Sequence, residues 1–469
     1  AMSEHHVDQD YLAKRQLKKG TAGWVLLAGL GVSYVISGDF AGWNFGIGVA
    51  GWGGFAIAAV LMAVMYLTLV LSLAEMSAAI PAAGGGYSFA RQVMGPSGGY
   101  LTGLAVLIEY VLAPAAIVVF IGAAVEALVG LNGPVIYATF YFIFVGIHLI
   151  GAGEALKLMM VITALAVFAI LATAITLFGS FETANLFDIA PDPSIAGANE
   201  YLPFGWHGVW AALPFGMWLF LAIEGVPLAA EEAKDPATDV PRGIVGAMLF
   251  LLVTAVLVVF LLAGAVGADA IGNSPVPLVD ALKHTGNTTL ATTVNVLGLA
   301  GLIASFFSII YGYSRLVFAL SRAGYLPRFL SLTNERKAPV WALAIPAALG
   351  FLISLTREGD LIIAMAVVGA TISYALMALS HILLRIKHPD MHRPYKTPGG
   401  VFTSSICLVL AVIALTGVYA FDPRAFNYTI VLYVIGALYY FLYSRNHLVA
   451  KTPEEEFEML AAAENELGE

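Results

Sequence analysis

The sequence predicts an all-α integral membrane protein with about twelve transmembrane helices. Hydrophobic residues make up 60% of the 469 positions and charged residues only 11%, whereas soluble globular domains are about one quarter charged. Mean hydropathy is +0.86, and apolar runs long enough to cross a bilayer, about 20 residues each, recur along the chain. A large soluble enzyme would need long charged stretches between its apolar helices, and the sequence has none.

The expected spans are separated by short polar or glycine- and proline-containing segments. They cover roughly residues 22–48, 52–80, 97–129, 133–151, 155–179, 207–230, 241–267, 289–320, 339–356, 360–386, 402–421 and 427–444. The polar N-terminal stretch leads directly into the first span, so we expect no cleavable signal peptide.

The placement of basic residues predicts the orientation. Of the 22 lysines and arginines, all but Lys283, Arg357 and Arg424 fall on the side that holds the N-terminus. Lysine and arginine are enriched in cytoplasmic loops, so both termini are expected in the cytosol.

Other features of the composition exclude whole classes of function. The formal charge of −9 comes largely from the acidic tail, residues 446–469, which we interpret as a solvated cytosolic segment. The single cysteine, Cys407, lies in an apolar run and can form no internal disulfide. No metal-ligand, phosphate-loop or nucleic-acid-binding pattern occurs, so we expect no cofactor, no metal, no nucleic acid partner and no enzymatic activity.

Two expected spans are interrupted at their centres. The first contains "SGDFAGWNFG" (37–46) and the sixth contains "WLFLAIEGVPLAAEE" (218–232). Glycine and proline are tolerated there only where the freed backbone groups find partners in protein or in a water-filled cavity. Close packing of small residues is the alternative. However, each break carries an acid, which costs about 2.5–3.5 kcal/mol at the bilayer centre on insertion scales. Matching breaks in two halves predict a transporter site between inverted repeats.

This reading divides the chain into six parts. They are a cytosolic N-terminal segment (1–21), a first repeat of five spans (22–179), an extracellular loop (180–206), a second repeat (207–387), two further spans with their preceding loop (388–445) and the acidic tail (446–469).

Four motifs in order resemble those of the amino acid–polyamine–organocation transporter superfamily. "LAEMSAAIPAAGGGYSFARQVMGPSGGY" follows the second span, "AIEGVPLAAEEAKDPATDVPRGI" ends the sixth, "YGYSRLVFALSRAGYLPRFL" ends the eighth, and "RPYKTPG" follows the tenth. The resemblance implies a five-plus-five, LeuT-like fold and transport by alternating access. Within the superfamily the chain is most similar to bacterial ethanolamine permeases, which implies a bacterial inner membrane.

The first break separates two kinds of substrate. Amino-acid carriers of this superfamily usually read Gly-Ser-Gly there, and the bare amides hold the substrate carboxylate. Here Ser37 and Gly38 are followed by Asp39, whose carboxylate would repel that of an amino acid. The resemblance therefore favours a small protonated amine, with ethanolamine the preferred substrate. An amino-acid permease or exchanger is the alternative, and a transporter-like sensor is a further one.

Three acids are expected deep inside spans, namely Asp39, Glu109 and Glu224, and no lysine or arginine is expected at that depth. In a low-dielectric environment such acids take up protons or bind a cation.

The expected binding model follows from the donors of a primary ammonium. The ammonium would lie near Ser37, Gly38 and Asp39 and the carbonyls of Ala222 and Ile223. A small polar head such as a hydroxyl would point toward Glu109 or Tyr110.

The resemblance also implies gates. Glu224 matches a gate-associated acid, and Trp218 matches an aromatic residue that covers the substrate from outside, with a lipid-facing or interfacial ring as the alternative. Tyr374 is interpreted as an inner gate or as ordinary packing. Glu75 is expected to pair with Arg91 or Arg322.

The coupling mode stays open. Some relatives carry a lysine three residues after a threonine on the fifth span, where this chain has Ala166 after Thr163. A sodium site would use hydroxyls on the eighth span, where Ser305 and Ser308 stand one turn apart. A coupling proton or sodium ion, exchange and uniport are all retained, and the oligomeric state is not predicted.

Overall fold

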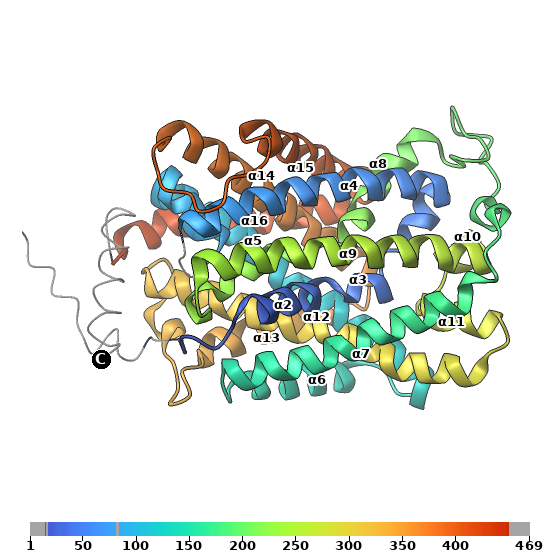
Figure 1. Cartoon of the computed structure of the whole chain (residues 1–469), viewed down its shortest axis with the longest axis horizontal. Coiled ribbons are helices and arrows are strands. Elements are labelled where there is room, and N and C mark those ends of the chain that lie inside the picture. Colours follow the sequence, from blue (N-terminus) through green and yellow to red (C-terminus); the bar gives the residue numbers. More distant parts are fainter. Residues whose placement is uncertain (1–14, 16, 81–83, 450–469) are drawn as a thin grey trace, which may run out of the picture.

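The computed structural model describes residues 15, 17–80 and 84–449, and within them every regular element is a helix. Figure 1 shows the long helices running side by side along the longest axis of the molecule. The helices are α2 (Trp24–Val35), α3 (Ser37–Phe40), α4 (Phe45–Ala79), α5 (Gly86–Val129), α6 (Pro134–His148), α7 (Ala152–Phe178), η1 (Thr183–Phe187), α8 (Gly205–Trp218), η2 (Ile223–Glu232), α9 (Pro236–Val266), α10 (Ala268–Gly272), α11 (Pro277–His284), α12 (Thr288–Arg322), η3 (Arg328–Ser331), α13 (Val340–Ser354), α14 (Gly359–Lys387), α15 (Val401–Phe421), α16 (Pro423–Leu442) and η4 (Ser444–Asn446).

The described helices confirm a multi-span membrane protein. Nine helical segments are long and apolar enough to cross a bilayer, and three shorter apolar segments accompany them: Trp24–Phe40, Pro134–His148 and Val340–Ser354. Together they correspond to the twelve spans expected from the sequence.

The boundaries differ from expectation at the first and second spans. The expected first span runs to residue 48, but α3 already ends at Phe40 and a turn follows. The helix then resumes at Phe45 and bends at Gly51, whose φ of 72° lies in the left-handed region that glycine adopts at no steric cost. The body of the second span therefore begins after Gly51, close to the expected residue 52.

The third span shows the same behaviour. Gly95, with φ of 79°, separates a preceding helical segment of α5 from the span proper, and Pro96 follows it. Proline is favoured in the first turn of a helix because its missing N–H would have no partner there. The expected start at residue 97 is thus a kink inside α5.

Both ends of the described chain lie at one end of the bundle. Arg15 Nε donates to Ser331 Oγ at 2.7 Å, and the Val449 amide donates to the Ala323 carbonyl at 2.9 Å. The opposite end carries α10 and α11 (Figure 1). An even number of crossings follows, as the sequence predicts. The acidic tail beyond residue 449 lies outside the described residues.

The segment that contains the second break is the most enclosed of the long apolar segments described. In the segment Gly205–Glu232, 94% of the residues in the most apolar stretch are buried. The corresponding share is 17% in Pro423–Asn446, which lies on the outside. Large apolar side chains such as Phe142 and Leu442 are exposed on the outer helices, where hydrocarbon rather than water would contact them. The arrangement surrounds the two broken segments with protein.

Candidate substrate site

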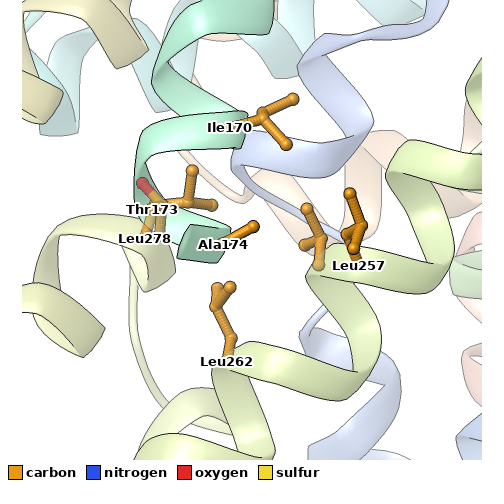
Figure 2. Close-up of a pocket in the computed structure, with 7 residues that line it drawn as sticks. Ile170, Thr173, Ala174, Leu257, Leu262 and Leu278 are labelled. Carbon is orange, nitrogen blue, oxygen red and sulfur yellow. The ribbon is translucent and has the colours of Figure 1, made fainter. Parts of the chain in front are cut away.

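An apolar pocket between α7, α9 and α11 is the wrong place for a polar substrate. Figure 2 shows it lined by aliphatic side chains and one threonine. The hydroxyl of that threonine, Thr173, is already committed to the Ala169 carbonyl at 2.8 Å. Groups able to recognise a charge lie instead at the two breaks.

The first break is held open by a side chain from α12. Ser305 Oγ accepts a hydrogen bond from the Ser37 amide at 2.9 Å and donates to the Ser33 carbonyl at 2.8 Å. The hydroxyl thus replaces the backbone bond that would otherwise join Ser37 to Ser33. Ser308 also faces this break, in a short hydrogen bond with Ser33 Oγ. Both serines therefore contact the first break, as a sodium site would require, but their hydroxyls are already bonded to protein.

The second break lies between α8 and η2. Ala222 has φ of 82°, a left-handed conformation that is uncommon for a residue with a Cβ, and its carbonyl accepts from the Gly225 amide at 3.0 Å. The two breaks touch, since a Cβ added to Gly38 would overlap the Trp218 carbonyl oxygen. Glycine at position 38 permits this close approach.

Two buried glutamates face each other beside the second break. Glu109 of α5 is 0% exposed and Glu224 of η2 is 2% exposed, and the two carboxyl groups lie close enough to influence each other electrostatically. Tyr374 donates to Glu224 Oε2 at 2.8 Å and is itself hydrogen-bonded to the Tyr66 hydroxyl at 2.9 Å. Among the described residues, neither oxygen of Glu109 nor Oε1 of Glu224 has a hydrogen-bond partner. The pair therefore offers three acceptor oxygens without a protein donor.

Aromatic hydroxyl groups complete the surroundings of the pair. The Tyr110 hydroxyl reaches the Ala222 carbonyl at 3.5 Å and lies beside Glu224, and the Tyr34 ring stands 6.1 Å from that of Tyr110. Gly225 faces both tyrosines, because a Cβ there would lie 2.7 Å from each. The two tyrosine hydroxyls, the two carboxyl groups and the Ala222 carbonyl thus form one polar cluster beside the second break.

Of the residues predicted for the site, the structure brings together Glu109, Tyr110, Ala222 and Glu224, with Ile223 adjacent in η2. Asp39 is not one of the residues around the glutamate pair. Its carboxyl lies beside Thr254 of α9 and makes none of the contacts that join the glutamate pair. The predicted roles themselves stay predictions.

The proposed gates occupy defined positions. Trp218 is 3% exposed, so the lipid-facing alternative is wrong. Its Nε1 donates to the Ala41 carbonyl at 2.8 Å, and its ring meets Phe120 edge-on at 6.4 Å. Tyr374 is hydrogen-bonded to Glu224 rather than packed only against apolar groups.

The expected partner of Glu75 is wrong. Glu75 binds Arg385 through both Oε atoms, at 3.0 and 2.9 Å from Nε, together with His381 at 2.8 Å and the Thr397 amide at 2.9 Å. The loop between α14 and α15 folds back over the end of α4 and supplies Thr397. The length of this loop alone does not predict that it folds back onto α4.

Sequence reasoning also missed a buried ion pair at the end of the bundle that holds both described chain ends. Arg315 donates to Glu232 through Nε at 2.7 Å and Nη2 at 3.2 Å, and the Tyr311 hydroxyl donates to Glu232 at 2.7 Å. Arg322 pairs with Glu231 at 2.9 Å. All of these residues belong to the sequence motifs quoted above. However, Arg315 and Glu232 are 83 positions apart, and no local sequence pattern indicates that they pair.

Many apolar helices around two touching breaks with buried acids are typical of a membrane transporter. Comparison with known proteins names the family: the chain belongs to the amino acid permeases, whose family model matches residues 23–436. The resemblance to the amino acid–polyamine–organocation superfamily is thereby confirmed.

Three relatives show the breadth of the family. The chain is 27% identical to an uncharacterized transporter, R00093, of Rhizobium meliloti over 88% of this chain and 89% of that protein. It is 26% identical to the branched-chain amino acid permease BcaP of Bacillus subtilis over 84% and 86%. It is also 26% identical to the methylthioribose transporter of Bacillus subtilis over 80% and 82%.

Proposed function

We propose that this permease imports a small protonated organic amine, ethanolamine being the preferred substrate, by alternating access across a bacterial inner membrane. The observation that carries the proposal is the buried pair of Glu109 and Glu224, whose free oxygens lack donors among the described residues. A primary ammonium supplies three N–H donors and one positive charge. Its three donors match these acceptors in number, and its charge balances the pair when one of the two carboxyl groups holds a proton.

The neighbouring groups agree with a short amine. Glu109 and Glu224 Oε1 would take two of the ammonium hydrogens, and the Ala222 carbonyl would take the third. The hydroxyl of ethanolamine would then lie against Tyr34 or Tyr110, which stand beside the break. Trp218 and Tyr374 would close the site from opposite sides.

The same groups disfavour a substrate carboxylate. Two carboxyl groups repel a third in a low-dielectric site. The Ser37 amide, which would help to hold that carboxylate, is occupied by Ser305.

An amino-acid permease or exchanger is the second candidate. It is favoured by the family match and by the name of the Bacillus subtilis relative BcaP. In this reading the substrate carboxylate would displace Ser305 from the Ser37 amide, and the substrate ammonium would lie at the glutamate pair.

Competition for uptake separates the two candidates. Purified protein in liposomes should take up labelled ethanolamine, and unlabelled ethanolamine should block this uptake while glycine, alanine and leucine leave it unchanged. Empty liposomes give the passive background. If neutral amino acids compete as well as ethanolamine does, the amine assignment is wrong and the second candidate replaces it.

A further inference from the structure

Asp39 is a third buried acid, outside the glutamate pair. It is 1% exposed, and neither carboxyl oxygen has a hydrogen-bond partner among the described residues. The polar side chain beside it is Thr254 of α9, whose hydroxyl donates to the Leu251 carbonyl at 3.1 Å. Asp39 and Thr254 thus form a second polar site, on the α9 side of the first break.

No basic residue neutralises Asp39 within the described part of the chain. Helices α2, α9 and α12 pack against α3. These three helices and α8 carry few titratable or charged groups, either beside the break or toward the helix ends. They are Tyr34, Asp239, Arg242, His207, Tyr311, Tyr313, Arg315 and Arg322. Arg242 stands twelve positions before Thr254, which is about 18 Å along a helix. Arg315 is committed to Glu232.

We propose that Asp39 and Thr254 form a proton site, separate from the amine pocket, which carries the coupling proton of uptake. A calcium or magnesium ion needs about six oxygen ligands, whereas the side chains of this site supply one carboxyl and one hydroxyl group. No group of three or more metal-ligating side chains occurs among the described residues. A proton needs only the carboxyl group. This proposal rests on the proposed amine transport.

The position of Asp39 connects its charge to the outer gate. The Asp39 carbonyl accepts from Trp43 Nε1 at 3.2 Å, and two residues later the Ala41 carbonyl accepts from Trp218 Nε1. In this closed arrangement the carboxyl is cut off from water, so it is tolerated as the neutral acid. Ionisation of the carboxyl group requires water. For water to reach it, α3 must move away from α9, the helix that carries Thr254.

A transport cycle then moves one proton with each amine. The carboxylate takes a proton when the site opens outward, the neutral acid permits closure over the loaded glutamate pair, and the proton leaves to water when the site opens inward. No bond other than the carboxyl O–H forms or breaks.

The decisive experiment compares Asp39→Asn with Glu224→Gln in liposomes clamped at zero membrane potential. Wild-type protein should accumulate ethanolamine several-fold when the interior is more alkaline by one pH unit, a gradient that drives passive weak bases outward. Asp39→Asn, which mimics the neutral acid, should lose this accumulation. It should keep ethanolamine exchange without a gradient, and ethanolamine-induced thermal stabilisation, within about threefold of wild type.

The controls distinguish the two proposals. Glu224→Gln should weaken exchange and stabilisation together, at least tenfold, because it removes the charge of an amine ligand. The amine proposal fails if the variant keeps both at the wild-type level. Thr254→Val should shift the pH at which accumulation is half-maximal, and Asp39→Glu should restore part of the accumulation. These two variants also serve if Asp39→Asn does not fold. The proton proposal is overturned if Asp39→Asn keeps pH-driven accumulation, if it loses stabilisation like Glu224→Gln, or if a sodium gradient alone drives the wild type.

Discussion

Gly38 is the residue at which the two broken segments touch. Replacement by alanine would place a Cβ against the Trp218 carbonyl, and backbone on both sides must then move apart. We expect Gly38→Ala to lower ethanolamine uptake at least tenfold and to lower the thermal midpoint. Gly246→Ala on α9 is the matched control, since its Cβ would meet only Trp24 at 4.0 Å. Alanine is favoured over glycine inside helices by about 0.5–1 kcal/mol. Equal effects of the two changes would contradict contact between the breaks.

The glutamate pair should be sensitive to charge rather than to size. Glu109→Gln and Glu224→Gln keep the side-chain shape but replace an acceptor oxygen with a donor and remove the charge. A hydrogen bond to a charged group contributes about 1.5–3 kcal/mol, so the ethanolamine concentration for half-maximal stabilisation should rise about 10- to 100-fold. Glu335→Gln, at an exposed position, should leave it unchanged. An unchanged value in both pair variants would remove the pair from the site.

Single residues of the site could be found from sequence because an acid in an apolar run has few explanations. Asp39, Glu109 and Glu224 were identified in this way, and all three are buried. Which acids meet could not be found, because spacing along one helix does not fix the rotation of its neighbours. The bonds from Tyr374 to Glu224 and Tyr66 join three separate segments and have no local signal.

At the scale of elements, η2 is joined to the start of α2 and to α12. The Glu232 carbonyl accepts from the amides of Thr21 and Ala22 at 2.9 and 3.2 Å, and its side chain binds Arg315. Removing one partner of a buried ion pair typically costs about 3–5 kcal/mol, because the other charge is left uncompensated.

Arg315→Ala should therefore lower the thermal midpoint strongly in detergent. Arg424→Ala removes the partner of Asp422 from a pair whose arginine is 57% exposed, and exposed pairs contribute about 0–1 kcal/mol. It should shift the midpoint only slightly. A small shift for Arg315→Ala would show that the Glu232 pair does not hold these elements together.

The number of apolar helices could be predicted from composition, whereas the kinks that depend on glycine conformation were harder to predict. Twelve apolar segments followed from hydropathy alone. In contrast, α4 and α5 each join two helical segments across a kink, at Gly51 and Gly95, where the backbone has a positive φ. Likewise, the return of Thr397 to Glu75 depends on loop conformation, which hydropathy does not encode. The five-plus-five repeat stays a prediction.

At the scale of the whole molecule, charge and burial are arranged around the bilayer. Buried acids gather at the touching breaks, while bulky apolar side chains such as Ile175 and Phe142 cover the outside. Most basic residues lie at the end where Arg15 and Val449 contact the segment 323–331. Because positive charge is retained in the cytoplasm, this end is expected to face inward.

Labelling of single cysteines tests that orientation. In a Cys407→Ala background, which removes the only cysteine of the sequence, Glu200→Cys and Glu335→Cys each place a thiol at an exposed loop position. The first loop lies at the end that carries α10, where Asp188 accepts from the Asp269 amide at 2.9 Å. The second lies at the opposite end. A membrane-impermeant maleimide added to intact cells should label Glu200→Cys fully and Glu335→Cys only after lysis. The reverse pattern would place both termini outside, and the amine would then enter the site from the face assigned here to release.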